Sequence, residues 1–142
     1  MEQFTQFFLH HWELFLVLGV ILGMLFGEPL LRGTRGYQGV GPLEATGLIS
    51  HQNALVLDVR EENEFKEGHV LNSIHIPAGK LSDRGKELEK HRERPVIVVC
   101  QSGNRSGRAS SFLHKQGFSS IYNLDGGLVA WRSANLPLTQ KR

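Results

Sequence analysis

The sequence predicts an α/β domain with a central parallel sheet flanked by helices, preceded by one N-terminal transmembrane helix. Two observations support this prediction. The fourteen residues from Leu14 to Gly27 carry no charge, and ten of them are Leu, Ile, Val or Phe. After Pro42, short apolar runs alternate with helix-like segments, which is the pattern of successive β-α units. The length of 142 residues suits one compact domain and hardly two.

Composition excludes several classes of protein. Cys100 is the one cysteine, so neither an intrachain disulfide nor a four-cysteine zinc site can form. The seven histidines lack metal-ligand spacing, so we expect no metal and no cofactor. The net charge is only +2, with 16 basic and 14 acidic residues spread along the chain. We therefore expect no nucleic-acid partner.

The apolar run near the N-terminus is predicted to be a membrane anchor over residues 1–31. At about 1.5 Å per residue the run covers about 21 Å of a hydrocarbon layer of roughly 30 Å, so the predicted span is about 8–27. A cleaved signal peptide or a buried core helix fits less well, because no Lys or Arg precedes the run and no small-residue cleavage site follows it. Arg32 and Arg35 come after the run. The positive-inside rule then predicts a single-pass protein of the inner (cytoplasmic) membrane, with the N-terminus outside and the remaining domain in the cytoplasm.

Glycines mark two features of this region. Gly19, Gly23 and Gly27 recur every four residues and would lie on one helix face, where a partner helix could approach. Glycine is also common in transmembrane helices generally, so the pattern alone leaves that partner open. Residues 32–42, which include GTRGYQGVGP, are predicted to be a flexible linker. A phosphate-binding loop is a weak reading, since no strand precedes these glycines and no Lys-Ser/Thr pair follows them.

Residues 43–142 are predicted to form the α/β domain. Helices are expected over 43–51, 61–68, 85–92, 106–117 and around 128–131, and strands over 54–59, 73–77, 95–100 and 120–124. Because the strands are apolar on both faces, a parallel sheet covered on both sides is expected, with functional loops at the carboxyl ends of its strands. Cys100 lies at such an end.

The loop from Cys100 to Ser106 is predicted to carry the chemistry. A thiol at the start of a helix is exposed to the positive end of the helix dipole, and loop amides can converge on it, so the thiolate is favoured. Arg105 adds a cation whose N–H fork suits an oxyanion. The alternative is that Cys100 packs as a small core residue, which would not require the Ser-Gly-Asn-Arg sequence that follows it.

Four motifs in order extend this interpretation: LDVREENEF, GHVLNSIHIP, CQSGNRS and NLDGGLVAW. Together they resemble the single-domain rhodanese family of sulfurtransferases, from about Leu43 to Pro137. The resemblance implies a rhodanese fold and a ping-pong reaction. Sulfane sulfur would pass from thiosulfate or another persulfide donor to a cyanide or thiol acceptor, each a small molecule or a protein. Cys100 would be the nucleophile and Arg105 the substrate-anion residue, with a substrate cradle formed by Gln101, Ser102, Gly103, Asn104, Arg105 and Ser106.

Two details bear on this resemblance. Cysteine phosphatases resemble C-x5-R, whereas Cys100 and Arg105 enclose four residues, the spacing of sulfurtransferases. Many relatives read Pro-Gly-Ala where this chain has Leu71-Asn72-Ser73, and a Ser or Thr where it has Gly41-Pro42. These departures lie outside the cysteine loop and bear on the substrate channel.

Other motif residues have a structural interpretation beside the functional one. Asp58 and Arg60 could border the site, but a hydrogen bond from Asp58 to loop backbone and a carboxylate partner for Arg60 are the simpler expectation. His69 reads as an architectural histidine rather than a catalytic base. Structural roles are also expected for a further set: core aromatics Phe65 and Trp131, a solvated helix face of Glu61, Glu62, Glu64 and Glu67, and a Gly126-Gly127 turn.

A second function competes with catalysis. The chain could be a membrane-tethered, rhodanese-like adaptor that binds a membrane or cytosolic protein without obligatory catalysis. The intact cysteine loop favours the enzyme.

Overall fold

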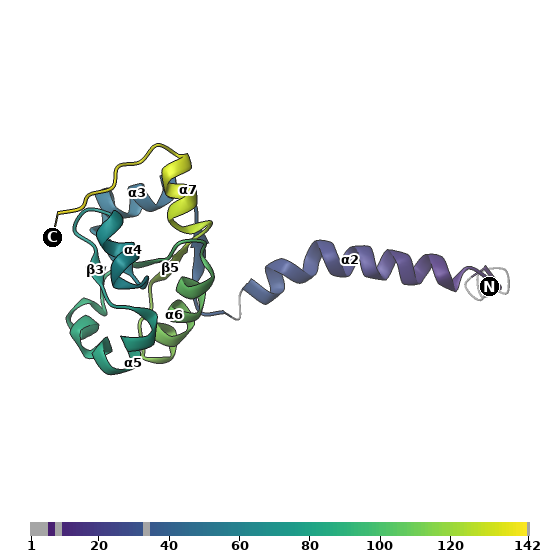
Figure 1. The fold of residues 1–142 in the computed structure, drawn as a ribbon. Helices are drawn as coiled ribbons and strands as arrows, with labels where there is room; N and C mark the ends of the chain where they lie inside the picture. The colour runs from purple at the N-terminus through teal and green to yellow at the C-terminus, as the bar shows by residue number, and fades with distance from the viewer. Residues whose placement is uncertain (1–5, 8–9, 33–34, 142) are drawn as a thin grey trace. The chain divides into compact units, whose positions relative to one another are not determined.

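The structure is a computed structural model that describes residues 6–7, 10–32 and 35–141, with the side chains of 28–32 left aside (Figure 1). It divides into two compact units, Met1–Thr34 and Arg35–Arg142. The first unit contains helix α2 (Trp12–Arg32). Apolar side chains from Leu14 to Phe26 are exposed along this helix.

The predicted transmembrane helix gains no support from this unit. Within the residues described, no helix combines the length and the apolar character that crossing a membrane requires. Residues 8 and 9, at the start of the predicted span, lie outside the described part of the chain.

The second unit is built on a five-stranded parallel sheet with the strand order β1-β5-β4-β2-β3. The strands are β1 (Gln38–Val40), β2 (Leu55–Asp58), β3 (Ile74–His75), β4 (Val96–Val99) and β5 (Ile121–Leu124). Asp58 pairs in register with Val99, so β2 and β4 end at the same edge of the sheet. The predicted α/β architecture with a central parallel sheet is confirmed.

Helices cover both faces of the sheet (Figure 1). Successive strand residues point to opposite faces, so Val98 packs with residues of α5 and α6 whereas Val99 packs with residues of α3 and α7. The bounds are α3 (Pro42–Gln52), α4 (Glu62–Glu67), α5 (Leu81–Arg84), α6 (Asn104–Lys115) and α7 (Gly127–Ser133), with 3-10 turns η1 (Ala78–Lys80) and η2 (Gly85–His91).

Several elements differ from the sequence prediction, which includes neither η1 nor α5. Strand β1 lies inside the segment 32–42, which is predicted to be a linker. Residues 33–34 of that segment lie outside the described part of the chain. This edge strand is three residues long and buries one apolar side chain, Val40, so QGV carries too short an apolar pattern to predict a strand. The segment 85–92, predicted as an α-helix, is the 3-10 turn η2, anchored by the buried side chain of Leu88.

Candidate active site

The loop between β4 and α6 is hydrogen-bonded to the start of α7. The carbonyls of Cys100 and Gln101 accept hydrogen bonds from the amides of Leu128 and Val129, at 2.9 and 3.2 Å. This approach requires a glycine, because a Cβ on Gly127 would lie 2.5 Å from both carbonyl oxygens. Gly127 also has a positive φ of 57°. With these two carbonyls turned toward α7, the amides that follow are free to face the cysteine side chain.

The Cys100 sulfur lies at the base of this loop and is fully buried. Its Sγ accepts a hydrogen bond from the Gly103 amide at 3.0 Å and one from the Ser106 hydroxyl at 3.3 Å. Burial raises the pKa of the Cys100 thiol, but hydrogen bonds from Ser106 and from the amides of Gly103 and Ser102 outweigh it, so the net pKa is lowered. These hydrogen bonds stabilise the thiolate, which is the nucleophilic form of cysteine.

Gly103 gives the loop its shape at the N-cap of α6. Its φ is 102°, in the left-handed region that favours glycine, and a Cβ there would lie 3.4 Å from the Leu124 carbonyl oxygen. This conformation directs the Gly103 amide to the sulfur while its carbonyl accepts from the Gly107 amide, as the first bond of the helix. Cys100 therefore lies just before a helix, as predicted, and the backbone at Gly103 turns an amide toward its sulfur.

Arg105 is engaged by a carboxylate from a different helix. Its two terminal nitrogens each donate to one oxygen of Glu64, both at 2.7 Å. The Arg105 hydrogen bonds hold the pKa of Glu64 at about 2, and the Glu64 carboxylate raises the pKa of Arg105. Glu64 Oε2 also accepts from the Glu61 amide at 3.0 Å, which closes a capping box at the start of α4.

Glu64 is one site residue that the sequence does not identify, since its pattern predicts a solvated helix face. The signal was its position in the first turn of the helix that follows β2, because β2 and β4 are neighbours ending at the same edge of the sheet. A carboxylate there is within reach of the cation in the β4–α6 loop.

Asp58 and Arg60 form a buried pair beneath the start of α4. Arg60 donates to both carboxylate oxygens of Asp58 through Nε, at 3.0 and 3.1 Å, and through a terminal nitrogen at 2.8 Å. The Arg60 amide donates to Asp58 as well, and the same terminal nitrogen of Arg60 reaches the Gly68 carbonyl at 2.7 Å. In the described structure these bonds tie the end of β2 to the end of α4, and none of them involves the Cys100 loop.

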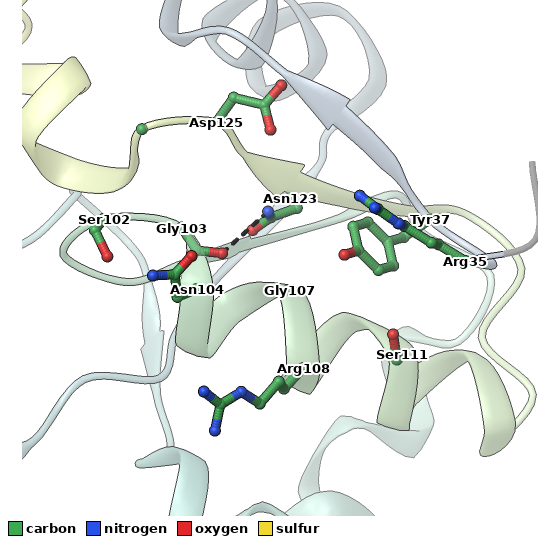
Figure 2. Close-up of a pocket in the computed structure, with 11 residues that line it drawn as sticks. Arg35, Tyr37, Ser102, Gly103, Asn104, Gly107, Arg108, Ser111, Asn123 and Asp125 are labelled. Atoms are coloured by element: carbon green, nitrogen blue, oxygen red, sulfur yellow. Dashed lines mark hydrogen bonds between the residues drawn. The ribbon is translucent and has the colours of Figure 1, made fainter. Parts of the chain in front are cut away.

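Part of the predicted cradle faces a polar pocket of about 420 Å³ beside the loop (Figure 2). Ser102, Gly103 and Asn104 line one wall, and Asn123 points into the loop from β5. Its Nδ2 donates to the Gly103 carbonyl at 3.2 Å. The side chain of Gln101 is half-buried.

His69 occupies an architectural position. Its ring stacks on Phe65 with centroids 3.8 Å apart, and its two nitrogens lie 2.9 and 3.0 Å from the carbonyls of Phe65 and Lys141. Among the residues described, no three His, Cys, Asp or Glu side chains gather in a way that could hold a metal ion.

The folded domain is similar in sequence and structure to known proteins. Residues 42–134 match the family model described as a rhodanese-like domain. The uncharacterized protein YibN of Escherichia coli K12 is 39% identical over 98 residues, which are 68% of this chain and 68% of YibN. Thiosulfate sulfurtransferase GlpE of Coxiella burnetii is 32% identical over 97 residues, covering 68% of this chain and 89% of GlpE. A rhodanese-related protein from Thermoplasma volcanium matches with a TM-score of 0.67 and 32% identity, over 74% of this chain and 100% of that one.

Proposed function

Because the chain belongs to the rhodanese family, we propose that it is a sulfurtransferase that carries sulfane sulfur on Cys100. The donor is thiosulfate or another persulfide, and the acceptor is cyanide or a thiol, either small or on a protein. The observation that carries the proposal is the buried Cys100 sulfur, which accepts hydrogen bonds from the Gly103 amide and the Ser106 hydroxyl. Similarity to a relative named as a thiosulfate sulfurtransferase supports the same reaction.

In the first half-reaction the Cys100 thiolate attacks the outer sulfur of thiosulfate. The S–S bond of thiosulfate breaks, sulfite leaves with the bonding electron pair, and Cys100 becomes a persulfide anion. In the second half-reaction an acceptor such as cyanide attacks the outer persulfide sulfur, so that thiocyanate leaves and the thiolate is restored. Charge balances in both steps, and no general base is needed when the thiol is already ionised.

The loop serves both anionic forms of the cysteine. The Gly103 amide and Ser106 hydroxyl that hold the thiolate are also the donors nearest to a persulfide formed on it. Gln101, Ser102 and Asn104 would complete the cradle around the donor.

Arg105 is proposed to attract the anionic donor, with Glu64 fixing its guanidinium. The charge of Arg105 is close enough to that of Cys100 for the two to interact, but two of its N–H groups are held by Glu64. A donor anion would therefore meet the N–H groups that Glu64 leaves free. Asp58 and Arg60 support the frame of the site and do not contact substrate in this proposal.

The test is the intact mass of the full-length chain, purified in detergent, after incubation with thiosulfate. We expect a gain of about 32 Da that cyanide removes and that C100S does not show, because the transferred atom is one sulfur on the thiolate. If neither thiosulfate nor glutathione persulfide adds mass to the wild-type chain, the sulfurtransferase proposal fails and the result favours the adaptor function.

We also propose that residues 1–31 anchor the chain in the inner membrane, with the N-terminus outside and the rhodanese domain in the cytoplasm. Support comes from the uncharged run Leu14 to Gly27 and from Arg32 and Arg35, which follow it. The apolar side chains exposed along α2 need lipid or a partner helix to cover them. The face with Gly19, Gly23 and Gly27 is where such a helix could approach.

Membrane fractions washed with carbonate should retain the full-length chain and release a variant lacking residues 1–31. Recovery of the full-length chain in the wash would contradict the anchor.

Replacing the three glycines with leucine should abolish crosslinking to a partner helix, and unchanged crosslinking would rule out that interface. In cells, loss of function in C100S favours sulfur chemistry, whereas loss only on deleting 1–31 favours an adaptor.

A further inference from the structure

Asn123 lies beside the Cys100 loop without a part in the sulfur transfer described above. It is a β5 residue that is 8% exposed, and its side chain lines the polar pocket (Figure 2). Its Nδ2 donates to the Gly103 carbonyl at 3.2 Å, and this bond orients the amide so that Oδ1 faces the Ser106 hydroxyl. Oδ1 and Ser106 Oγ are 2.5 Å apart.

The Ser106 hydroxyl has more acceptors than it can serve. Its Oγ lies 2.5 Å from Asn123 Oδ1, 3.1 Å from the Gly103 carbonyl oxygen and 3.3 Å from Cys100 Sγ. A serine hydroxyl carries one proton, so it donates fully to one of these acceptors at a time. Of the three acceptors, Asn123 Oδ1 lies closest to the Ser106 hydroxyl oxygen and Cys100 Sγ lies farthest from it.

We propose that Asn123 is a positioning residue that competes with the Cys100 sulfur for the Ser106 proton and so limits the reactivity of the cysteine. In the thiol form the Ser106 hydroxyl donates to Asn123, and in the thiolate form it turns to the sulfur. Because Nδ2 is held by the Gly103 carbonyl, the Asn123 amide cannot rotate to donate to Ser106 without losing that bond. The inference rests on the proposed role of Cys100 as the nucleophile.

Burial is the largest single influence on the pKa of Cys100 and raises it, whereas the hydrogen bonds to the sulfur together lower it further than burial raises it. Among contributions that lower the pKa of Cys100 against the effect of burial, the Ser106 hydroxyl bond is the largest. The charged group that faces Cys100 from α6 is Arg105, which is paired with Glu64 of α4. A change in where the Ser106 proton points should therefore be visible in the ionisation of the thiol.

The test is the rate of Cys100 alkylation by iodoacetamide as a function of pH, using the full-length chain. N123A removes the Asn123 acceptor, so the Ser106 hydroxyl can turn to the thiolate without giving up a bond to Asn123, and we expect about three- to tenfold faster alkylation below the midpoint of the profile. N123D has a similar size and gives up the Nδ2 bond to the Gly103 carbonyl, but its carboxylate accepts the Ser106 proton more strongly and adds negative charge, so we expect slower alkylation and a midpoint at higher pH.

A second background separates this role from a general loosening of the loop. In S106A there is no hydroxyl proton to compete for, so adding N123A should leave the alkylation profile unchanged. An equal effect of N123A with and without Ser106 would overturn the proposal. The proposal also fails if N123A is alkylated no faster than wild type.

S110A is the matched control, since Ser110 is a buried α6 serine whose hydroxyl donates to the Ser106 carbonyl at 2.8 Å rather than to the sulfur. Alkylation needs no sulfur donor, so this result stands apart from failure of the sulfurtransferase proposal. If N123A does not fold, the N123D profile decides, and an unshifted midpoint overturns the proposal.

Discussion

At the residue scale, the pair between Glu64 and Arg105 links the catalytic loop to the helix that follows β2. The two groups meet through two hydrogen bonds of 2.7 Å, and each side chain is about one-third exposed. Solvent screens a pair of this exposure, so its value lies more in orienting Arg105 than in stability.

E64Q should show this in the pH dependence of unfolding. The pKa of Glu64 is about 2 in the folded chain against an ordinary 4.5, so its contribution is complete above about pH 4.5 and is lost as the pH falls toward 2. We expect wild type to exceed E64Q by about 0.5–1 kcal/mol at pH 7 and the gap to close by about pH 2. Urea unfolding of both chains across this range measures it, and a gap independent of pH would contradict the assignment.

The pair between Asp58 and Arg60 is different because both side chains are buried, at 0% and 1% exposed. R60M removes the cation and leaves the Asp58 carboxylate buried with only an amide as its partner, so we expect a loss of about 3–5 kcal/mol in urea unfolding. R84M is the matched control, since Arg84 pairs with Glu87 on the surface and its removal should change stability little. Equal effects of the two substitutions would refute the burial argument.

At the scale of elements, the site depends on α7 meeting the β4–α6 loop. The first amides of α7 donate to the loop carbonyls, and these contacts leave no room for a side chain on Gly127. The loop amides then face the sulfur because the carbonyls are already committed. Helix placement in this domain therefore controls the hydrogen bonds on Cys100 without supplying a side chain to it.

G127A should damage both stability and cysteine reactivity. The added Cβ would meet backbone oxygens at 2.5 Å at a φ of 57°, so the loop must shift, and we expect a loss of about 1–3 kcal/mol together with slower alkylation of Cys100 at neutral pH. G47A is the matched control: Gly47 lies in α3 with no atom within 4 Å of its Cβ position, and it should gain about 0.5–1 kcal/mol. G127A with wild-type stability and reactivity would contradict the role given to α7.

At the scale of the whole molecule, the sequence predicts the elements whose structure depends on particular side-chain types. The apolar strand around Val98 and the Cys100–Ser106 loop were predicted because burial and backbone shape select those residue types. Strand β1 was not, because it is three residues long and Val40 is its one buried side chain. Glu64 and Asn123 were missed as partners of the loop because each belongs to a different element, and only the strand order brings those elements together.

The division into two units makes a prediction for the chain as a whole. Both apolar cores and every hydrogen bond recorded for the Cys100 sulfur belong to residues 35–142. A compact unit with its own core can fold alone. Residues 35–142 should therefore unfold cooperatively and show the Cys100 alkylation profile of the full-length chain. Urea unfolding and iodoacetamide kinetics on both chains check this. A shifted profile in the shorter chain would mean that residues 1–34 act on the cysteine site, and the hydrogen bonds within the domain would then be insufficient to explain its reactivity.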